Sequence, residues 1–249
     1  MLEEIGRVEA LFRYPVKSMA GERLEVANLG WYGLEGDRRL ALRRVDDRSG
    51  MPWLTASRLP GLLQFAPYRQ DGAQGDLPTD VRTPDGNQLP IFGEELANEV
   101  ARRHGAPVQM MQLRHGIFDE APISVIASDT VYEIGRLVGR SLDVRQFRPN
   151  VVVRPLRSVP FQEDDWLGGV LSFGEGDTAP AVAVTLRDER CGMVNLDPDS
   201  ATPAPEVMKT IVRVNQNHAG IYAAVIRIGQ LAVGQTILLS RAAEKRERG

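Results

Sequence analysis

The sequence predicts a mainly β protein with three short helices, in a barrel-like arrangement. Short segments that alternate apolar and polar residues, or carry a β-branched bias, recur along the chain. The 24 glycines and 16 prolines interrupt these segments at close intervals, as turns between strands require. Helical spacing of apolar residues is confined to three stretches, and the many short strands favour a barrel.

The first half of the chain is predicted to hold strands at residues 7–12, 24–29 and 40–45. Residues 13–21 contain a proline and end on a glycine, so they form a loop between the first two strands. Residues 83–87 read Thr-Pro-Asp-Gly-Asn, which is a strong hairpin-turn signal between two further short strands.

The three helices are predicted where apolar residues lie three and four positions apart. They cover residues 94–104, a stretch beginning at residue 128, and residues 206–214. Thr130 and Glu133 stand at capping-box spacing in the second helix. The strands of the second half are expected at residues 123–127, 151–153, 181–186, 221–228 and 236–239.

Cys191 is the only cysteine of the chain. The apolar segment at residues 181–186 predicts a strand before it, and the four charged residues 187–190 predict that the chain leaves the sheet there. A thiolate at a strand end can ligate a thiophilic metal or carry sulfur. The alternative is a buried cysteine that fills apolar space.

The composition limits the class of protein. The 249 residues suffice for one large domain or two smaller ones. A formal net charge of −3 gives no electrostatic case for nucleic acid as the main partner. No apolar segment approaches the roughly 20 residues that span a bilayer, so we expect no membrane partner. A single cysteine excludes an internal disulfide and fits a reducing compartment, so we expect a cytoplasmic protein.

Several polar residues stand where loops meet strands. Lys17 and Ser18 lie in the loop after the first strand, where a cation beside a hydroxyl can hold phosphate. Arg38 follows an aspartate in a glycine-rich loop, where it can clamp an anion or pin the loop through a salt bridge. Arg148 and Asn150 flank a proline, which would present both at one strand entrance. The alternatives are solvated surface residues and a turn former.

Four fragments carry a resemblance to a known family. They are Tyr14-Pro-Val-Lys-Ser18, Gly36-Asp-Arg38, Phe147-Arg-Pro-Asn150, and Arg190-Cys191 followed by Asp197-Pro-Asp199, with a weaker match at Gly234-Gln-Thr-Ile-Leu-Leu239. In this order they resemble the MOSC family, named for the C-terminal domain of molybdenum-cofactor sulfurase. Within it they are most similar to the mitochondrial amidoxime-reducing component and its bacterial relatives. The fragments span nearly the whole chain.

The resemblance implies a β-barrel-like MOSC domain at residues 100–240, preceded by an N-terminal β-barrel domain at residues 1–95. It also implies a molybdenum cofactor, a molybdopterin whose Mo takes Cys191 as an additional sulfur ligand. It assigns binding of the pterin and its phosphate to the polar residues of the fragments and, through a looser match, to two hydroxyl residues that start the second helix. The residues so implied are Lys17, Ser18, Arg38, Ser128, Thr130, Arg148, Asn150 and Arg190.

The chain departs from the family pattern at three places. Ser200-Ala201 stands where Asp-Pro-Asp is commonly followed by Thr-Gly in relatives. Met19 follows Lys17-Ser18 where relatives often carry a polar residue or cysteine. No cysteine-rich ferredoxin-like domain accompanies the fragments. Electrons are therefore expected from a separate donor protein, of ferredoxin or cytochrome type with its reductase.

Three functions are compatible with these fragments. The first is a molybdenum-dependent oxidoreductase that removes oxygen in a two-electron reaction, with Cys191 as the catalytic metal ligand and a small-molecule substrate such as an N-hydroxylated compound. The second is a sulfur carrier or sulfurtransferase that uses a Cys191 persulfide. The third is a non-catalytic protein that binds or delivers the cofactor.

Overall fold

The structure, a computed structural model, describes residues 2–241 of the chain. In the first half the elements are β1 (Leu2–Arg13), β2 (Glu22–Leu24), β3 (Val26–Gly30), β4 (Gly33–Leu34), β5 (Leu40–Arg44), η1 (Pro60–Gln64), β6 (Ala66–Tyr68), β7 (Asp80–Arg82), β8 (Gln88–Pro90), α1 (Glu94–His104) and β9 (Val108–Gln112). In the second half they are β10 (Ile123–Ala127), α2 (Ser128–Val138), η2 (Val144–Phe147), β11 (Val151–Pro155), η3 (Gln162–Trp166), β12 (Val170–Phe173), β13 (Ala181–Glu189), η4 (Gly192–Asn195), α3 (Glu206–Asn215), β14 (His218–Arg227), β15 (Gly229–Ala232) and β16 (Thr236–Ser240). The mainly β fold with three α-helices is as predicted.

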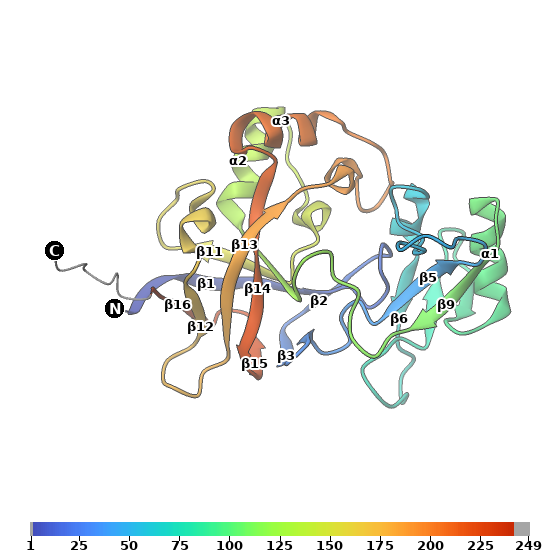
Figure 1. The fold of residues 1–249 in the computed structure, drawn as a ribbon, viewed down its shortest axis with the longest axis horizontal. Helices are drawn as coiled ribbons and strands as arrows, with labels where there is room; N and C mark the ends of the chain where they lie inside the picture. The colour runs from blue at the N-terminus through green and yellow to red at the C-terminus, as the bar shows by residue number, and fades with distance from the viewer. Residues whose placement is uncertain (1, 242–249) are drawn as a thin grey trace.

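Seven strands close into a barrel, which fills the left and centre of Figure 1. Their order is β11-β10-β14-β13-β12-β16-β1, and β1 closes the ring by pairing with β11. β10 and β11 run parallel, whereas the other six neighbouring pairs run antiparallel. Closure pairs both edges of every strand in the ring, so the barrel exposes no open edge there.

The 12-residue strand β1 makes this closure possible because it pairs on both sides. Its register shifts between Glu4 and Gly6 on the β16 side, and between Val8 and Ala10 on the β11 side. A Cβ added to Gly6 would lie 2.3 Å from the carbonyl oxygen of Arg154, so glycine is required where β1 meets β11. These bulges bend β1 around the barrel.

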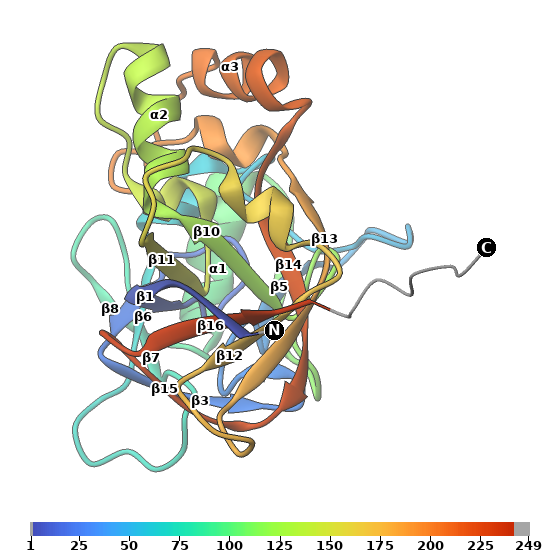
Figure 2. The same cartoon turned by 90° about the vertical axis from the view of Figure 1, so that its left-hand side faces the viewer.

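Apolar residues on alternate positions of the strands fill the barrel interior. Among them, Leu11, Val125, Val151, Phe173 and Ile221 are fully buried. On the outside, α2 packs against β10 and β11, and α3 packs against β14. A second apolar cluster joins them to the barrel and includes Phe12, Ile134, Val152, Val207 and Ile211. Figures 1 and 2 show both helices on the same outer side of the barrel. Within residues 2–241, no helix combines the length and apolar character needed to cross a membrane.

A smaller lobe lies to the right of the barrel in Figure 1. It contains the β5–β9 pair, the meander β6-β7-β8 and helix α1. Its core includes Leu40, Leu54, Phe65 and Leu96. Met19, which is fully buried, belongs to the same core although it stands in the loop directly after β1. This loop therefore leads from the barrel into the smaller lobe and fixes one to the other.

The division into residues 1–95 and 100–240 stays a prediction. β1, from the N-terminal part, completes a barrel whose other six strands come from residues 123–240. The smaller lobe pairs β5 with β9, which come from either side of the expected boundary. Each lobe thus contains strands from both sides of residues 95–100.

Three local predictions are wrong. β13 continues to Glu189 instead of ending at Leu186, because its charged end is accepted by specific partners: Arg187 pairs with Asp164 at 2.8 Å. The expected strand at residues 24–29 is divided into β2 and β3. The capping box does not form, because Thr130 Oγ1 donates to Glu163 and Glu133 pairs with Arg136.

Candidate functional site

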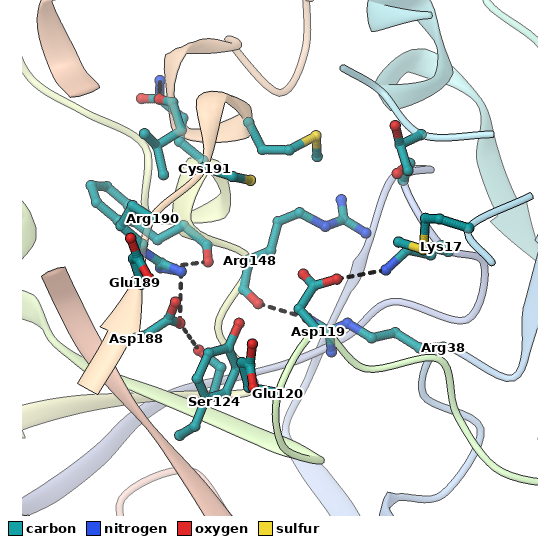
Figure 3. A pocket seen from close by; sticks show the side chains of 18 residues that line it. Lys17, Arg38, Asp119, Glu120, Ser124, Arg148, Asp188, Glu189, Arg190 and Cys191 are labelled. Atoms are coloured by element: carbon teal, nitrogen blue, oxygen red, sulfur yellow. Dashed lines mark hydrogen bonds and ion pairs between the residues drawn. The ribbon is translucent and has the colours of Figure 1, made fainter. Parts of the chain in front are cut away.

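A cavity of about 440 Å³ lies where the barrel meets the smaller lobe. The barrel contributes the ends of β10 and β13, Tyr222 in the middle of β14 and the turn at residues 146–148. The lobe side contributes residues 17–18, 51 and 55. Figure 3 shows its side chains converging from both sides. The expected residues that line it are Lys17, Ser18, Arg38, Arg148, Arg190 and Cys191. Up to 174 positions of sequence separate them, the largest separation being between Lys17 and Cys191.

Cys191 lies two residues after the end of β13 and directly precedes η4. The thiol is free and the residue is exposed, so Cys191 is not an apolar filler of the core. Its backbone is extended, with φ −103° and ψ 174°, and the following Gly192 begins the 3₁₀ turn. β13 therefore delivers the thiol to the cavity, as Figure 3 shows.

Lys17 and Ser18 are almost completely buried, at 8% and 5% exposure. They are therefore not the solvated surface residues that the alternative interpretation expected. The amide of Lys17 donates to the carbonyl of Leu40 at 2.8 Å, which ties the loop to β5. The Lys17 ammonium contacts Asp119 Oδ1, also at 2.8 Å. Burial alone would raise the pKa of Asp119, but Lys17 and the arginines Arg38 and Arg148 hold it below its usual value.

Arg38 and Arg148 bring two guanidinium groups to the same wall. Arg38 pairs with Asp37, and its Nη2 donates to the carbonyl oxygen of Arg148 at 3.0 Å. Arg148 Nη1 donates to the carbonyl oxygen of Met19 at 2.8 Å, whereas its buried Nη2 has no hydrogen-bond partner among residues 2–241. Burial lowers the pKa of Arg148 to about 10, so the group stays protonated at neutral pH.

Three residues that line the cavity have left-handed backbone conformations. The φ angles of Ser18, Arg38 and Arg148 are 66°, 50° and 49°. Such angles are uncommon for residues other than glycine and cost energy that the surrounding structure must supply. Strain of this kind concentrates at binding and catalytic sites, which gives an indication of function that is independent of side-chain chemistry.

Asp37 joins three of the sequence fragments. Its Oδ1 accepts the backbone amide of Tyr14 at 2.7 Å, and its Oδ2 accepts from Arg38 and from Asn150 Nδ2. Asn150 Oδ1 in turn accepts from the amide of Ser124 at 3.1 Å. Both carboxylate oxygens are thus satisfied although Asp37 is only 1% exposed. The Gly-Asp-Arg fragment places Arg38 by means of this buried aspartate.

Arg190 holds the chain next to Cys191. Its Nη1 donates to Asp188 Oδ2 at 2.7 Å and its Nη2 donates to the carbonyl oxygen of Phe147 at 2.8 Å. Asp188 Oδ2 also accepts from the hydroxyl of Ser124 at 2.9 Å. Arg190 therefore connects the end of β13 to the turn before Arg148, and its position fixes the direction in which Cys191 leaves the sheet.

Two protein-family models match the chain. The MOSC domain model matches residues 88–238, and the MOSC N-terminal beta barrel domain model matches residues 5–121. The chain belongs to the MOSC family. Its fold is similar to the crystal structure of the YUAD protein from Bacillus subtilis, at 15% identity and a TM-score of 0.53, over 97% of this chain and 100% of that one.

A second solved structure, YiiM from Geobacillus stearothermophilus, is matched at 19% identity and a TM-score of 0.38, over 48% of this chain and 54% of that one. No curated protein matches the chain in sequence. The family assignment therefore rests on the two MOSC domain models.

Two of the residues that the MOSC resemblance assigned to the cofactor lie outside the cavity. Thr130 is fully buried in the first turn of α2, where its hydroxyl donates to Glu163 at 2.8 Å and accepts the amide of Phe161 at 2.8 Å. The Ser128 hydroxyl donates to the carbonyl oxygen of Val153 at 3.3 Å, and the residue lines a different cavity beside α2. α2 starts on the outer side of the barrel, so its first turn faces away from Cys191.

Asn150 is close to the cavity but does not open into it. It is fully buried, and it borders only a small neighbouring hollow together with Arg38 and Tyr222. Its Nδ2 donates to the carbonyl oxygen of Phe12 at 3.3 Å and to Asp37 at 3.1 Å. The amide of Asn150 is therefore used within the protein and positions Arg38 rather than contacting a ligand.

Sequence reasoning missed a second group of residues in the MOSC cavity. These are the acidic, hydroxyl and phenol groups of Asp119, Glu120, Ser124, Asp188, Glu189 and Tyr222. Ser124 and Tyr222 occur within apolar strands, and their only signal was a polar residue between two residues that fill the barrel interior. Burial raises the pKa of Tyr222, so its hydroxyl remains protonated.

Four cations and four carboxylates line the cavity, and one of the cations has no carboxylate partner in the described part of the chain. Lys17, Arg38 and Arg190 each have a carboxylate partner, whereas Arg148 has no ion pair among the described residues. Its unpartnered Nη2 is therefore a ready donor to a phosphate. Within residues 2–241 no three His, Cys, Asp or Glu side chains are grouped to hold a metal ion, so a metal at Cys191 would need its other ligands from the cofactor.

Proposed function

We propose that this MOSC protein is a molybdenum-cofactor-dependent reductase that removes oxygen from N-hydroxylated small molecules. One observation carries the proposal: the exposed thiol of Cys191 opens onto the same cavity as the cations Lys17, Arg38 and Arg148. A soft thiolate suits molybdenum, and guanidinium groups suit a phosphate. A pterin cofactor that carries both molybdenum and a phosphate group would match this combination of thiolate and cations.

Each residue has a distinct part in this scheme. Cys191 supplies the thiolate ligand, and Arg148 is the first cation available to a phosphate because its Nη2 is unpartnered. Lys17 already faces Asp119, so a phosphate there would share the ammonium with that carboxylate. Arg190 and Asn150 position Cys191 and Arg38 through the hydrogen bonds described above. When bound, the cofactor supplies the two-electron oxygen-atom chemistry.

The overall reaction determines what else is needed. Removal of oxygen from an N-hydroxylated compound consumes two electrons and two protons, and it releases water and the reduced nitrogen compound. We propose that the electrons come from a separate donor protein and that the reaction takes place in the cytoplasm, where a lone free thiol stays reduced. The substrate enters through the open side of the cavity, beside the exposed Cys191.

Metal analysis of the full chain tests the proposal. Protein purified from a host that makes the cofactor is expected to contain molybdenum and, with an artificial reductant, to reduce an amidoxime. Cys191→Ser should fold normally and lose amidoxime reduction, and Arg148→Gln should lower the molybdenum content. Arg102→Gln is the matched control, because Arg102 pairs with Glu99 on α1, outside the cavity. Absence of molybdenum from the wild-type protein would overturn the proposal.

A second candidate is a sulfur carrier, which the exposure of Cys191 also favours because a carrier must present its thiol to other proteins. The two functions use the thiol in different ways. In the cofactor-loaded reductase, Cys191 is expected to resist alkylation until the cofactor is removed, since a coordinated thiolate is less nucleophilic. Rapid alkylation of loaded protein, together with transfer of labelled sulfur from a persulfide donor to Cys191, would replace the reductase with the carrier.

A further inference from the structure

A second cavity lies on the other side of Arg148. It has a volume of about 430 Å³ and includes Tyr14, Gly21, Arg82, Arg145 and Arg148 in its lining. Arg148 lines both this cavity and the one that contains Cys191, so its side chain forms part of the wall between them. Cys191 does not line the second cavity.

Two buried hydrogen-bond donors in this wall have no partner among residues 2–241. They are the hydroxyl of Tyr14 and Nη2 of Arg148. Tyr14 is only 1% exposed, and the Arg148 guanidinium carbon lies 4.2 Å from the centre of its ring. Burial raises the pKa of Tyr14 to about 12, so the hydroxyl keeps its proton and can donate it. Buried donors in folded proteins are nearly always partnered, by protein, water or ligand.

The packing of Tyr14 holds its ring in place. A Cβ added to Gly21 would lie 2.4 Å from Cε1 of Tyr14, so the ring packs directly on the glycine backbone. Two other side chains contact the Tyr14 ring. Phe12 stacks on it with ring centres 6.4 Å apart, and the guanidinium carbon of Arg38 lies 5.0 Å from the ring centre. The ring of Tyr14 is therefore held in place by Gly21, Phe12 and two guanidinium groups.

The second cavity has an excess of positive charge. Three arginines line it, and its one lining carboxylate, Asp199, is engaged by Arg145 through two hydrogen bonds of 2.9 and 2.7 Å. Arg82 has no ion pair within the described residues and rests over the ring of Tyr68 at 5.7 Å. Arg82 and Arg148 are thus cations free to meet an anion here.

We infer that this cavity is an oxyanion site that binds a phosphate group between Tyr14, Arg148 and Arg82. A phosphate has enough acceptor oxygens for the phenol and both guanidinium groups, whereas a water molecule cannot balance their charge. The site lies on the opposite side of Arg148 from the cofactor site proposed above, and it shares the Arg148 guanidinium with that site. The inference does not depend on the presence of molybdenum.

Calorimetric titration of cofactor-free full chain with inorganic phosphate tests this site. Wild-type protein is expected to bind phosphate. Tyr14→Phe and Arg82→Gln should each weaken binding about tenfold, the effect of losing one charge-assisted hydrogen bond. The remote Arg102→Gln should change it less than about twofold. If Lys17→Gln abolishes binding while Tyr14→Phe leaves it unchanged, phosphate binds in the other cavity and the inference is wrong.

Thermal unfolding gives a second measurement on the same variants. Tyr14→Phe removes a hydroxyl that has no protein partner, so it should not lower the Tm in phosphate-free buffer. Phosphate should raise the Tm of the wild type more than that of Tyr14→Phe. Equal shifts in both proteins, or no shift in the wild type, would contradict the site.

Glycerol 3-phosphate distinguishes free phosphate from a phosphate carried by a larger ligand. The cavity is larger than a phosphate ion, so tighter binding of the ester than of inorganic phosphate is expected if the natural ligand is an organic phosphate. If the ester binds more weakly but still depends on Tyr14 and Arg82, the site takes free phosphate. Both outcomes support the oxyanion site, and loss of the Tyr14 dependence for both probes rejects it.

Discussion

Asn150 Nδ2 donates a 3.1 Å hydrogen bond to Asp37 Oδ2 across 113 positions of sequence. Both residues are buried, and through them the fragments that contain Tyr14, Arg38 and Arg148 meet at one point. This bond fixes the position of Arg38, which extends from Asp37 toward the cavity. One buried polar network therefore joins these fragments, and each fragment contributes residues to it.

Asn150→Ala should lower the free energy of unfolding by about 3 kcal/mol, since Asp37, Phe12 and Ser124 would lose buried hydrogen bonds to the same amide. Urea unfolding measures this change. Asn28→Ala, which removes two exposed hydrogen bonds, one to Glu35 and one from Gln230, is the matched control and should cost less than about 0.5 kcal/mol. Equal losses in the two variants would mean that the Asp37–Asn150 network contributes little.

Arg190→Met should destabilise the protein by about 3–4 kcal/mol at neutral pH, because it leaves Asp188 buried without a cation. The double variant Asp188→Asn with Arg190→Met removes the uncompensated charge and should recover part of this loss. A double-mutant cycle by chemical denaturation provides the values. If the double variant is no more stable than Arg190→Met, the charge of Asp188 is not the cause.

Glu163 should make stability depend on pH. It is fully buried, and burial raises its pKa from 4.5 to about 7. Between these values the folded protein holds a proton that the unfolded chain has lost, so stability falls as the pH rises from 4.5 to 7. The contribution amounts to about 3 kcal/mol. Below pH 4.5 both states are protonated and the contribution is fully retained.

Glu163→Gln should remove this part of the pH dependence, since the amide keeps an acceptor for Thr130 and cannot ionise. Unfolding measured at pH 5 and pH 8 should show the variant gaining on the wild type only at the higher pH. Glu175→Gln, at an exposed loop position, is the control and should follow the wild type. A constant difference between Glu163→Gln and the wild type at both pH values would contradict the burial argument.

Ala201→Gly should stabilise the protein by about 1 kcal/mol, because Ala201 has φ 56° in the turn after Asp197-Pro-Asp199. The turn itself is intact: the amide of Ala201 donates to the carbonyl oxygen of Asp197 at 2.9 Å. Ala106→Gly, in an exposed loop without a positive φ, should instead cost a few tenths of a kcal/mol. A loss of stability in Ala201→Gly would mean that the left-handed conformation is not strained.

Much of the fold could be predicted from local patterns. The helix at residues 94–104 has the expected bounds, and the strand at 123–127 does as well, because apolar spacing and an adjacent glycine or helix start define them locally. The family fragments also identified Cys191 and the cations that line its cavity. The charged end of β13 was misjudged because charge normally ends a strand, and the partner of Arg187 comes from Asp164 in η3.

The tertiary structure decided which side chains meet. Ser128 and Thr130 begin a helix that the sequence located correctly, yet barrel closure puts that helix on the outer side, away from Cys191. The same closure turns Ser124 and Tyr222 toward the cavity. Sequence periodicity records whether a residue is buried, but the direction of its side chain relative to distant segments depends on how β1 closes the barrel. That closure joins residues more than a hundred positions apart, and no local pattern encodes it.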